Sequence, residues 1–252
     1  MNFNLKMVFL WWLVGWRAWR INKYARKYRK LPDQYTPQQR NDWLLKKAKK
    51  VLKLFNIKLN VEGYENLTKG PMLLVPNHKN NMDPIIILVA LAKQTGDSSV
   101  MNKIPTFLAK KELMKKRTTR NTLSLLDTFF IDRNDFRQSI EALNNFGAFV
   151  KENRTYGVVF PEGRRVSEKL ELDEFKAGAF KIASSQYLPI VPVAISDTRE
   201  ADNKNRNKKL NVTVKFLTPI KPSSFIGMDF QAIGNRCKEI IEKEVVVNER
   251  SQ

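Results

Sequence analysis

From residue 59 onward, short apolar runs alternate with longer stretches in which apolar residues recur every three or four positions. Runs of four to eight apolar residues are typical of buried strands, and the longer period is typical of helices. The expected strands lie within 59–67, 72–75, 106–109, 125–133, 155–160, 188–195 and 210–217. The expected helices are 85–91, 135–153, 174–186 and 229–247, with polar loops at 115–122 and 197–209. The helix over 135–153 is expected to be amphipathic, and its apolar face carries Phe136, Ile140, Leu143, Phe146 or Gly147, and Val150. This alternation predicts an α/β domain over 59–252 with a mostly parallel central sheet flanked by helices, in which late strands can be antiparallel.

Residues 7–16 (MVFLWWLVGW) form an uninterrupted apolar run at the start of the chain. Ten helical residues extend only about 15 Å, roughly half of a bilayer core, so this segment is not expected to span a membrane by itself. Arg17, Trp19 and Arg20 follow instead of a small-residue cleavage site, which argues against a secretory signal peptide. Tryptophan and arginine at the end of a short apolar helix favour the membrane interface over a protein core.

A second helix is expected from Gln38 to Phe55, after a Thr36-Pro37 start. Its apolar positions fall on one face and its lysines on the rest. The apolar positions are Leu44, Ala48, Val51, Leu52 and Phe55. This helix either lies on anionic lipid or packs its apolar stripe on the following domain and leaves its lysines in water. Residues 1–58 are therefore predicted to be a two-helix, membrane-associating region.

The formal net charge of +20 points to an anionic partner. Residues 1–58 contain fifteen of the 45 Lys and Arg, only two of the 25 acids, and all five tryptophans. A basic nucleic-acid-binding protein is an alternative, but the charge lies beside tryptophans and apolar helices, and no nucleic-acid-binding motif is present. The distribution instead favours a membrane lipid surface as the partner of this region.

The chain contains one cysteine, Cys237, and one histidine, His78. An intramolecular disulfide is thus excluded, and a zinc or iron site is not expected. No G-x-S-x-G nucleophile motif, Walker A loop or dinucleotide-binding fingerprint is present.

His78 follows the strand at 72–75, and Asp83 lies five residues later, before Pro84 at the start of a helix. A carboxylate on one imidazole nitrogen fixes the tautomer and leaves the other nitrogen as a base. The alternative is a hydrogen-bonded loop histidine and an aspartate that caps the free helix amides.

Four expected strand ends carry polar residues, at 77–83, 110–112, 132–134 and 161–165. Ligands of open α/β sheets bind outside the carboxyl ends of the strands, and cations there favour a phosphate or carboxylate group. A base without a protein nucleophile indicates that a hydroxyl of the substrate is the nucleophile.

Four motifs occur in the order found in the glycerophospholipid acyltransferases, and together they resemble that family over residues 59–220. NHKNNMD (77–83) resembles the N-H-x-x-x-x-D motif, FIDR (130–133) the second motif, FPEGRR (160–165) the third, and VPVAI (191–195) the fourth. AKKEL (109–113) and FKAGAF (175–180) match segments between them. The most similar subgroup is the bacterial acyltransferases that act on 1-acyl-sn-glycerol-3-phosphate.

The resemblance implies transfer of a fatty acyl chain from an acyl thioester to the sn-2 hydroxyl of 1-acyl-sn-glycerol-3-phosphate (lysophosphatidate). The product, phosphatidate, would enter phospholipid biosynthesis. The donor would be acyl-acyl carrier protein or acyl-CoA, with no further cofactor. The enzyme would be peripheral or monotopic at the cytoplasmic face of the cell membrane. Glycerol-3-phosphate or another lysophospholipid is the alternative acceptor.

The resemblance also implies roles for individual residues. His78 would be the general base, and Asp83 would orient it. The substrate-binding residues would be Lys110, Arg133 and Arg165 around the phosphate, Glu162 and Gly163 shaping the pocket, and also Asn77 and Arg164. Val191 and Pro192 would lie beside the acyl channel.

The third motif departs from the usual F-P-E-G-T-R-S, because Arg164 replaces Thr and Val166 replaces Ser. The loop is therefore bulkier and more basic, which concerns the acceptor more than the chemistry. An inactive relative is the corresponding alternative, and the intact His78 and Asp83 argue against it. Arg133 has the alternative role of a surface ion pair with Asp132 or Asp135, and Glu162 that of a loop cap.

Overall fold

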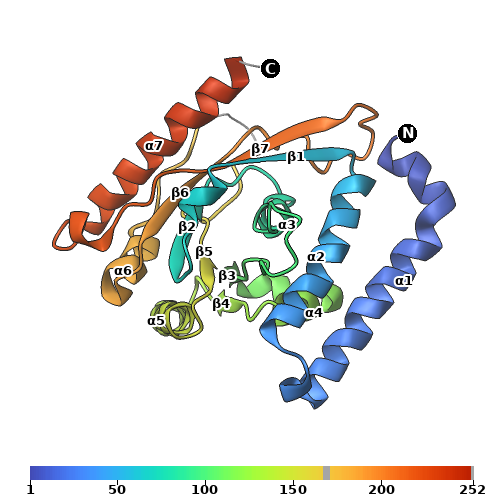
Figure 1. Ribbon diagram of the computed structural model, residues 1–252, viewed down its shortest axis with the longest axis horizontal. Helices are drawn as coiled ribbons and strands as arrows, with labels where there is room; N and C mark the ends of the chain where they lie inside the picture. The colour runs from blue at the N-terminus through green and yellow to red at the C-terminus, as the bar shows by residue number, and fades with distance from the viewer. Residues whose placement is uncertain (167–170, 251–252) are drawn as a thin grey trace.

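The computed structural model describes residues 1–166 and 171–250, with the side chains of 246–250 left out of the description. It shows a seven-stranded sheet with helices on both faces (Figure 1). The strands are β1 (Ile57–Glu62), β2 (Met72–Pro76), β3 (Pro105–Lys110), β4 (Phe129–Ile131), β5 (Tyr156–Val158), β6 (Ile190–Ile195) and β7 (Leu210–Phe216). Their order in the sheet is β1-β7-β6-β2-β5-β3-β4.

All neighbouring strands are parallel except β6 and β7, where Val193 lies opposite Phe216 in an antiparallel pair. The prediction of a mostly parallel sheet with a late antiparallel strand is thus confirmed. The carboxyl ends of β2, β3, β4, β5 and β6 share one edge of the sheet. Because β1 is parallel to β7 and runs opposite to these five strands, β1 begins at that same edge.

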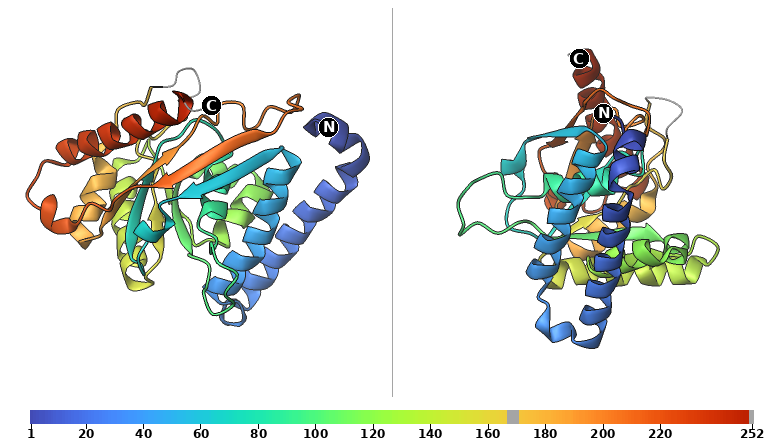
Figure 2. Two further views of the ribbon diagram at one scale, coloured as in Figure 1. Left: turned by 45° about the horizontal axis from the view of Figure 1, so that its top comes forward. Right: turned by 90° about the vertical axis from the view of Figure 1, so that its right-hand side faces the viewer.

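The α-helices divide between the two faces of the sheet, as the two views of Figure 2 also show. They are α1 (Phe3–Lys30), α2 (Pro37–Leu54), α3 (Asp83–Ala90), α4 (Arg117–Ser124), α5 (Phe136–Glu152), α6 (Ala177–Gln186) and α7 (Phe230–Arg250). On β2, Leu74 faces the cluster formed with α2 and α3, whereas Leu73 and Val75 face the cluster formed with α5, α6 and α7. Every β2 residue is buried, as expected for a strand covered on both faces.

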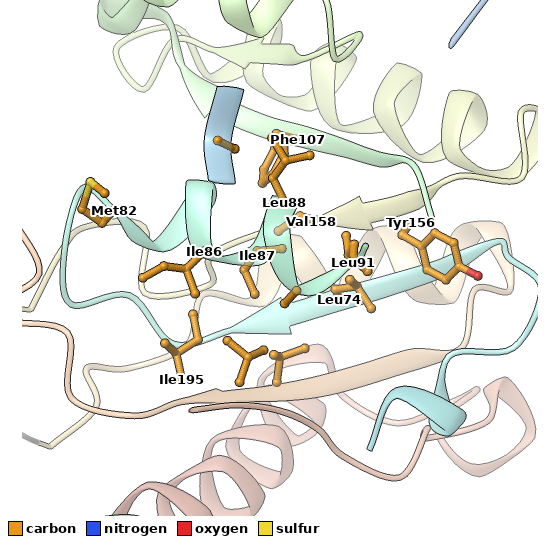
Figure 3. Close-up of a cluster of buried hydrophobic side chains, with 14 of the residues drawn as sticks. Leu74, Met82, Ile86, Ile87, Leu88, Leu91, Phe107, Tyr156, Val158 and Ile195 are labelled. Atoms are coloured by element: carbon orange, nitrogen blue, oxygen red, sulfur yellow. The ribbon is translucent and has the colours of Figure 1, made fainter. Parts of the chain in front are cut away.

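Helix α3 fills the space between α2 and the sheet (Figure 3). Its residues Ile86 and Ile87 are fully buried with Leu74 and Val158 of the sheet. Each such side chain contributes roughly 1.5–3 kcal/mol relative to an exposed one. The amino end of α3, which carries Asp83, is thereby fixed at the edge where β2 ends.

Helix α2 packs its apolar stripe on the domain, which decides between the two alternatives left open by the sequence. Leu44, Leu45, Ala48 and Leu52 are buried, and α2 contacts both α3 and β1. Lys46, Lys49, Lys50 and Lys53 are exposed on its other faces. The second helix of residues 1–58 therefore shares the main hydrophobic core.

Helix α1 is a single helix of 28 residues, much longer than the apolar run it contains. Only Ala25 is buried, and four tryptophans are between 45% and 68% exposed. They are Trp11, Trp12, Trp16 and Trp19. Near its start, Lys6 Nζ donates to the carbonyls of Lys53 and Leu54 at the end of α2. No helix in the part of the chain that the structure describes combines the length and apolarity needed to cross a membrane.

The structure corrects the expected loop at 115–122, because Arg117–Ser124 form α4. This polar segment has no apolar period of its own, and contacts with α1 order it. Asn121 is buried, donates to Asn22 Oδ1 at 2.8 Å and accepts from Arg29 Nη1 at 2.8 Å.

Two further expectations near this segment were wrong. The strand expected over 125–133 is restricted to β4, because Leu125 and Leu126 are buried in the preceding turn and Asp127 adopts a left-handed φ of 47°. Phe136, expected on the buried face of its helix, is 79% exposed, because it forms the first residue of α5 at the edge of the molecule.

Candidate active site

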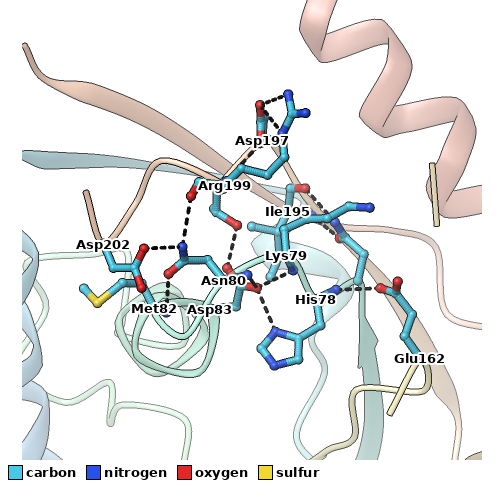
Figure 4. A network of polar contacts seen from close by, with 12 residues as sticks. His78, Lys79, Asn80, Met82, Asp83, Glu162, Ile195, Asp197, Arg199 and Asp202 are labelled. Atoms are coloured by element: carbon cyan, nitrogen blue, oxygen red, sulfur yellow. Dashed lines mark hydrogen bonds and ion pairs between the residues drawn. The ribbon is translucent and has the colours of Figure 1, made fainter. Parts of the chain in front are cut away.

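His78 and Asp83 meet in the loop between β2 and α3 (Figure 4). His78 Nδ1 lies 2.8 Å from Asp83 Oδ2. The Asp83 side chain is fully buried, and that of His78 is 16% exposed. The pairing of Nδ1 leaves the other ring nitrogen, Nε2, for a substrate.

Asp83 is held by loop groups and does not cap α3 as the sequence suggested. Its Oδ2 atom also accepts from the backbone amides of Lys79 at 2.7 Å and Asn80 at 2.8 Å. Its Oδ1 atom accepts from Thr198 Oγ1 at 2.7 Å. These contacts fix both carboxylate oxygens and, through Oδ2, the orientation of the His78 ring.

Thr198 is a site residue that the sequence analysis missed. It is fully buried and lies three residues after the end of β6. Its signal was its place shortly after VPVAI, but the loop at 197–209 was expected to be only a polar connection.

Asn77 lies behind the site and holds the loop to β6. Its side chain donates to Ile195 O at 2.9 Å and accepts from Ile195 N at 2.8 Å. With 1% of its surface exposed, Asn77 positions its neighbour His78. Val191 and Pro192 of the fourth motif are also buried, and Val191 packs in the core on the side of α2 and α3.

The loop after β5 holds the backbone of His78. Glu162 Oε1 accepts from the amide of His78 at 2.7 Å, and the amide of Val166 donates to the carbonyl of His78 at 2.9 Å. Burial raises the pKa of Glu162, although the amides of His78 and Asp173 oppose this shift. The Phe160 ring lies 4.3 Å from the imidazole, centroid to centroid.

Arg133 joins the second motif to the third by donating to the carbonyl of Gly163. Gly163 has a φ of 67°, and a Cβ atom there would lie 2.8 Å from Arg133 Nη2 and 3.3 Å from Lys176 Cε. A side chain at this position would therefore displace both cations. Beside them is a pocket of about 290 Å³ that Glu162 also lines.

Four cations gather at this edge of the sheet. The pKa of Lys110 is lowered, first by burial and further by the charges of Arg133, Arg165 and Lys176. Lys176 directly precedes α6. Lys176 belongs to the FKAGAF segment, for which the resemblance implied no role.

Other charged residues of these loops have partners of their own. Arg164, whose side chain is 69% exposed, forms an ion pair of 2.6 Å with Asp173. Asp132 pairs with Lys111 at 3.1 Å, and Asp135 accepts from an amide of α5. Among the ion pairs of the described residues, Arg133 forms none with either aspartate, so its alternative role is not seen.

An oriented histidine beside a cluster of cations defines a site suited to proton abstraction from an anionic substrate. Within the described residues, no group of three or more His, Cys, Asp or Glu side chains is arranged to hold a metal ion. The chain belongs to the acyltransferase family, because residues 58–196 match the model of the family described as Acyltransferase. The expected family is thus confirmed, and the chain is an acyltransferase.

The chain is similar to acyltransferases whose names state an acceptor. The chain is 34% identical over 224 residues to the probable 1-acyl-sn-glycerol-3-phosphate acyltransferase of Mycoplasma pneumoniae. The matched region covers 84% of this chain and 80% of that protein. It is 31% identical over 254 residues to the probable 1-acyl-sn-glycerol-3-phosphate acyltransferase of Mycoplasma genitalium, with 94% and 88% covered. The crystal structure of the 1-acyl-sn-glycerophosphate acyltransferase PlsC from Thermotoga maritima has the same fold, with a TM-score of 0.69 and 22% identity over 98% of this chain and 93% of that one.

Proposed function

We propose that this acyltransferase moves a fatty acyl group from an acyl thioester to the sn-2 hydroxyl of 1-acyl-sn-glycerol-3-phosphate and produces phosphatidate. The observation that carries the proposal is the His78–Asp83 pair at the same sheet edge as the cations around Gly163. The names of the relatives support this acceptor. The donor is the thioester of acyl carrier protein or CoA.

In the proposed reaction, His78 Nε2 removes the proton from the acceptor hydroxyl as its oxygen attacks the thioester carbonyl. The new C–O bond forms, the C–S bond breaks, and the thiolate leaves and takes the proton from the imidazolium. No acyl-enzyme is needed, because the acceptor itself is the nucleophile. Positioning can supply about 7–11 kcal/mol and base catalysis about 10²–10⁴-fold.

The acceptor phosphate is proposed to bind Lys110, Arg133, Arg165 and Lys176. Gly163 keeps the space in which Arg133 and Lys176 approach, and Glu162 holds the loop from which His78 projects. Arg164, tied to Asp173, stands at the rim of this pocket. In this proposal the reacting groups of both substrates lie at the carboxyl ends of the strands, where ligands of open α/β sheets bind.

Residues 1–58 are proposed to hold the enzyme on the cytoplasmic face of the cell membrane as a peripheral or monotopic protein. The exposed tryptophans of α1 support this, because Arg20 and Lys23 lie over the rings of Trp16 and Trp19 at 4.9 and 4.7 Å. Such aromatic and cationic side chains suit the headgroup zone of a bilayer.

An acceptor screen tests the proposed function. Purified protein in mixed micelles receives labelled acyl thioester with 1-acyl-sn-glycerol-3-phosphate, glycerol-3-phosphate or neutral lysolipids. Phosphatidate is the expected product, and product formed only from another acceptor would refute the proposal. A parallel set with carrier-protein and CoA thioesters identifies the donor.

Replacing Arg133 by glutamine is expected to raise the acceptor KM by about 10- to 100-fold, because a charge-assisted hydrogen bond contributes about 1.5–3 kcal/mol. The donor KM should change little. Steady-state kinetics with each substrate varied in turn measures both values. Arg137→Gln, which removes an exposed guanidinium from the adjacent helix, is the matched control. A larger effect on the donor KM would mean that these cations bind the thioester.

A further inference from the structure

A second surface with the character of a membrane contact lies outside residues 1–58. It begins in the 3-10 helix η3 (Lys111–Lys115) and continues into α4. Leu113 and Met114 are 44% and 36% exposed, although both are apolar. The exposed cations around them are Lys111, Lys115, Lys116, Arg117 and Arg120, with Glu112 as the one acid of residues 111–120. We call Leu113, Met114 and these five cations the η3–α4 patch.

The η3–α4 patch lies next to α1. Asn22 donates to Thr118 Oγ1 at 3.2 Å, and Asn121, about one turn further along α4, contacts both Asn22 and Arg29. Helix α4 therefore packs on α1 around Asn22. Because η3 directly precedes α4, it lies close to this part of α1, and exposed Trp19 is three residues before Asn22.

The η3–α4 patch and helix α2 lie on different sides of α1. In the right-hand view of Figure 2, α2 lies on one side of α1, and the region of α4 and α5 projects on the other. Helix α4 thus lies on a side of α1 that α2 does not occupy. One lipid surface can contact both segments without a rearrangement of the fold.

The η3–α4 patch is close to the proposed phosphate site. Lys110 is the last residue of β3, and η3 begins at the next residue. A surface bound to η3 would therefore lie beside the cluster of Lys110, Arg133 and Arg165. An acceptor whose phosphate lies at the headgroup level would reach these cations from the membrane plane.

We propose that the η3–α4 patch binds an anionic lipid surface and, together with α1, seats the mouth of the site on the membrane. Exposed apolar side chains between cations suit the boundary of acyl chains and headgroups. An acidic protein would explain the cations, but the continuity with the tryptophans of α1 favours lipid. The proposal goes beyond the acyl transfer reaction and holds for any acceptor.

Partition into vesicles tests this directly, without substrate. The full chain and the variant Lys115→Gln/Lys116→Gln are titrated with phosphatidylcholine vesicles that contain or lack phosphatidylglycerol. Each lysine near an anionic surface contributes about fivefold in affinity, so the double variant should bind the anionic vesicles about 25-fold more weakly. Its binding to the neutral vesicles should be unchanged. Leu113→Ser/Met114→Ser should weaken binding to both kinds of vesicle.

Matched controls come from the far face of the sheet. Lys181→Gln/Lys221→Gln removes two exposed lysines there, and Ile226→Ser/Met228→Ser removes two apolar side chains that are 49% and 39% exposed. Both controls should bind vesicles like the wild type. Transfer to a soluble short-chain acceptor should also remain at the wild-type rate in Lys115→Gln/Lys116→Gln, which separates lost lipid contact from a damaged site.

Unchanged vesicle binding by both patch variants would overturn the proposal. The proposal would also be overturned if the patch variants bound vesicles normally and lost transfer only from carrier-protein thioesters. An acidic protein would then be the partner of the η3–α4 patch. A failed acceptor screen leaves the vesicle result intact, so failure of the proposed function and failure of this inference are distinguishable.

Discussion

Replacing His78 by alanine is expected to reduce acyl transfer about 10²–10⁴-fold, because it removes the Nε2 atom that is proposed to act as the base. The wild-type ring is oriented by Asp83, whose remaining contacts come from the backbone and Thr198. Turnover with saturating thioester and lysophosphatidate measures the effect. Circular dichroism and vesicle binding should remain those of the wild type, because the side chain is small and partly exposed.

Thr198→Val is a milder change at the same site and complements His78→Ala. It removes one hydroxyl donor from Asp83 Oδ1 but leaves His78 in place. A loss in kcat smaller than that of His78→Ala is expected, with little change in the acceptor KM, because Thr198 positions the pair and does not bind the phosphate. Near-wild-type turnover in His78→Ala would refute the base assignment, whereas equal losses in both variants would indicate that orientation dominates.

The His78–Asp83 pair could be predicted because both residues belong to one short loop. The supporting contacts could not, since they come from distant segments: Glu162 is 84 residues from His78, and Thr198 is 115 from Asp83. Only the sheet brings these loops together. The sequence thus predicted that His78 and Asp83 meet, and the structure does not show the alternative role of Asp83 as a helix cap.

The elements of the fold were likewise predicted where they depend on local sequence and missed where they depend on distant contacts. Continuous apolar runs predicted β2 and β6, which are buried on both faces. Helix α4 was missed because its order depends on α1, roughly 90 residues earlier in the chain. Phe136 was misplaced because helical periodicity defines a face but not whether a neighbour covers its first turn.

Many residues of the four motifs connect the loops of the site to one another. The site therefore depends on these contacts as well as on its reactive residues. Both backbone groups of His78 are bound by the loop after β5. Asn77 binds the end of β6, and Arg133 binds the carbonyl of Gly163. A change in one loop is therefore transmitted to the base and to the cations at once.

A buried ion pair connects α2 to the segment before β4, and its loss should have the largest effect on stability. Arg40 Nη1 donates to Asp127 Oδ1 and Nη2 donates to Oδ2, both at 2.8 Å, and Nη1 also donates to Leu125 O at 2.9 Å. Arg40 is 4% exposed, and its guanidinium lies over the ring of Tyr28. It thus fixes the turn from which β4 carries Arg133 to the site.

Arg40→Met is expected to lower the free energy of unfolding by about 3 kcal/mol, because it leaves Asp127 and a buried carbonyl without their partner. This value is the lower end of the range that is usual for breaking a buried ion pair, because the Asp127 side chain is 22% exposed. Urea denaturation followed by circular dichroism measures the change. Arg26→Met, which removes an exposed arginine of α1, should cost far less. If the two variants proved equally stable, the ion pair would not be what anchors β4, and the packing of Leu125 and Leu126 would have to hold it alone.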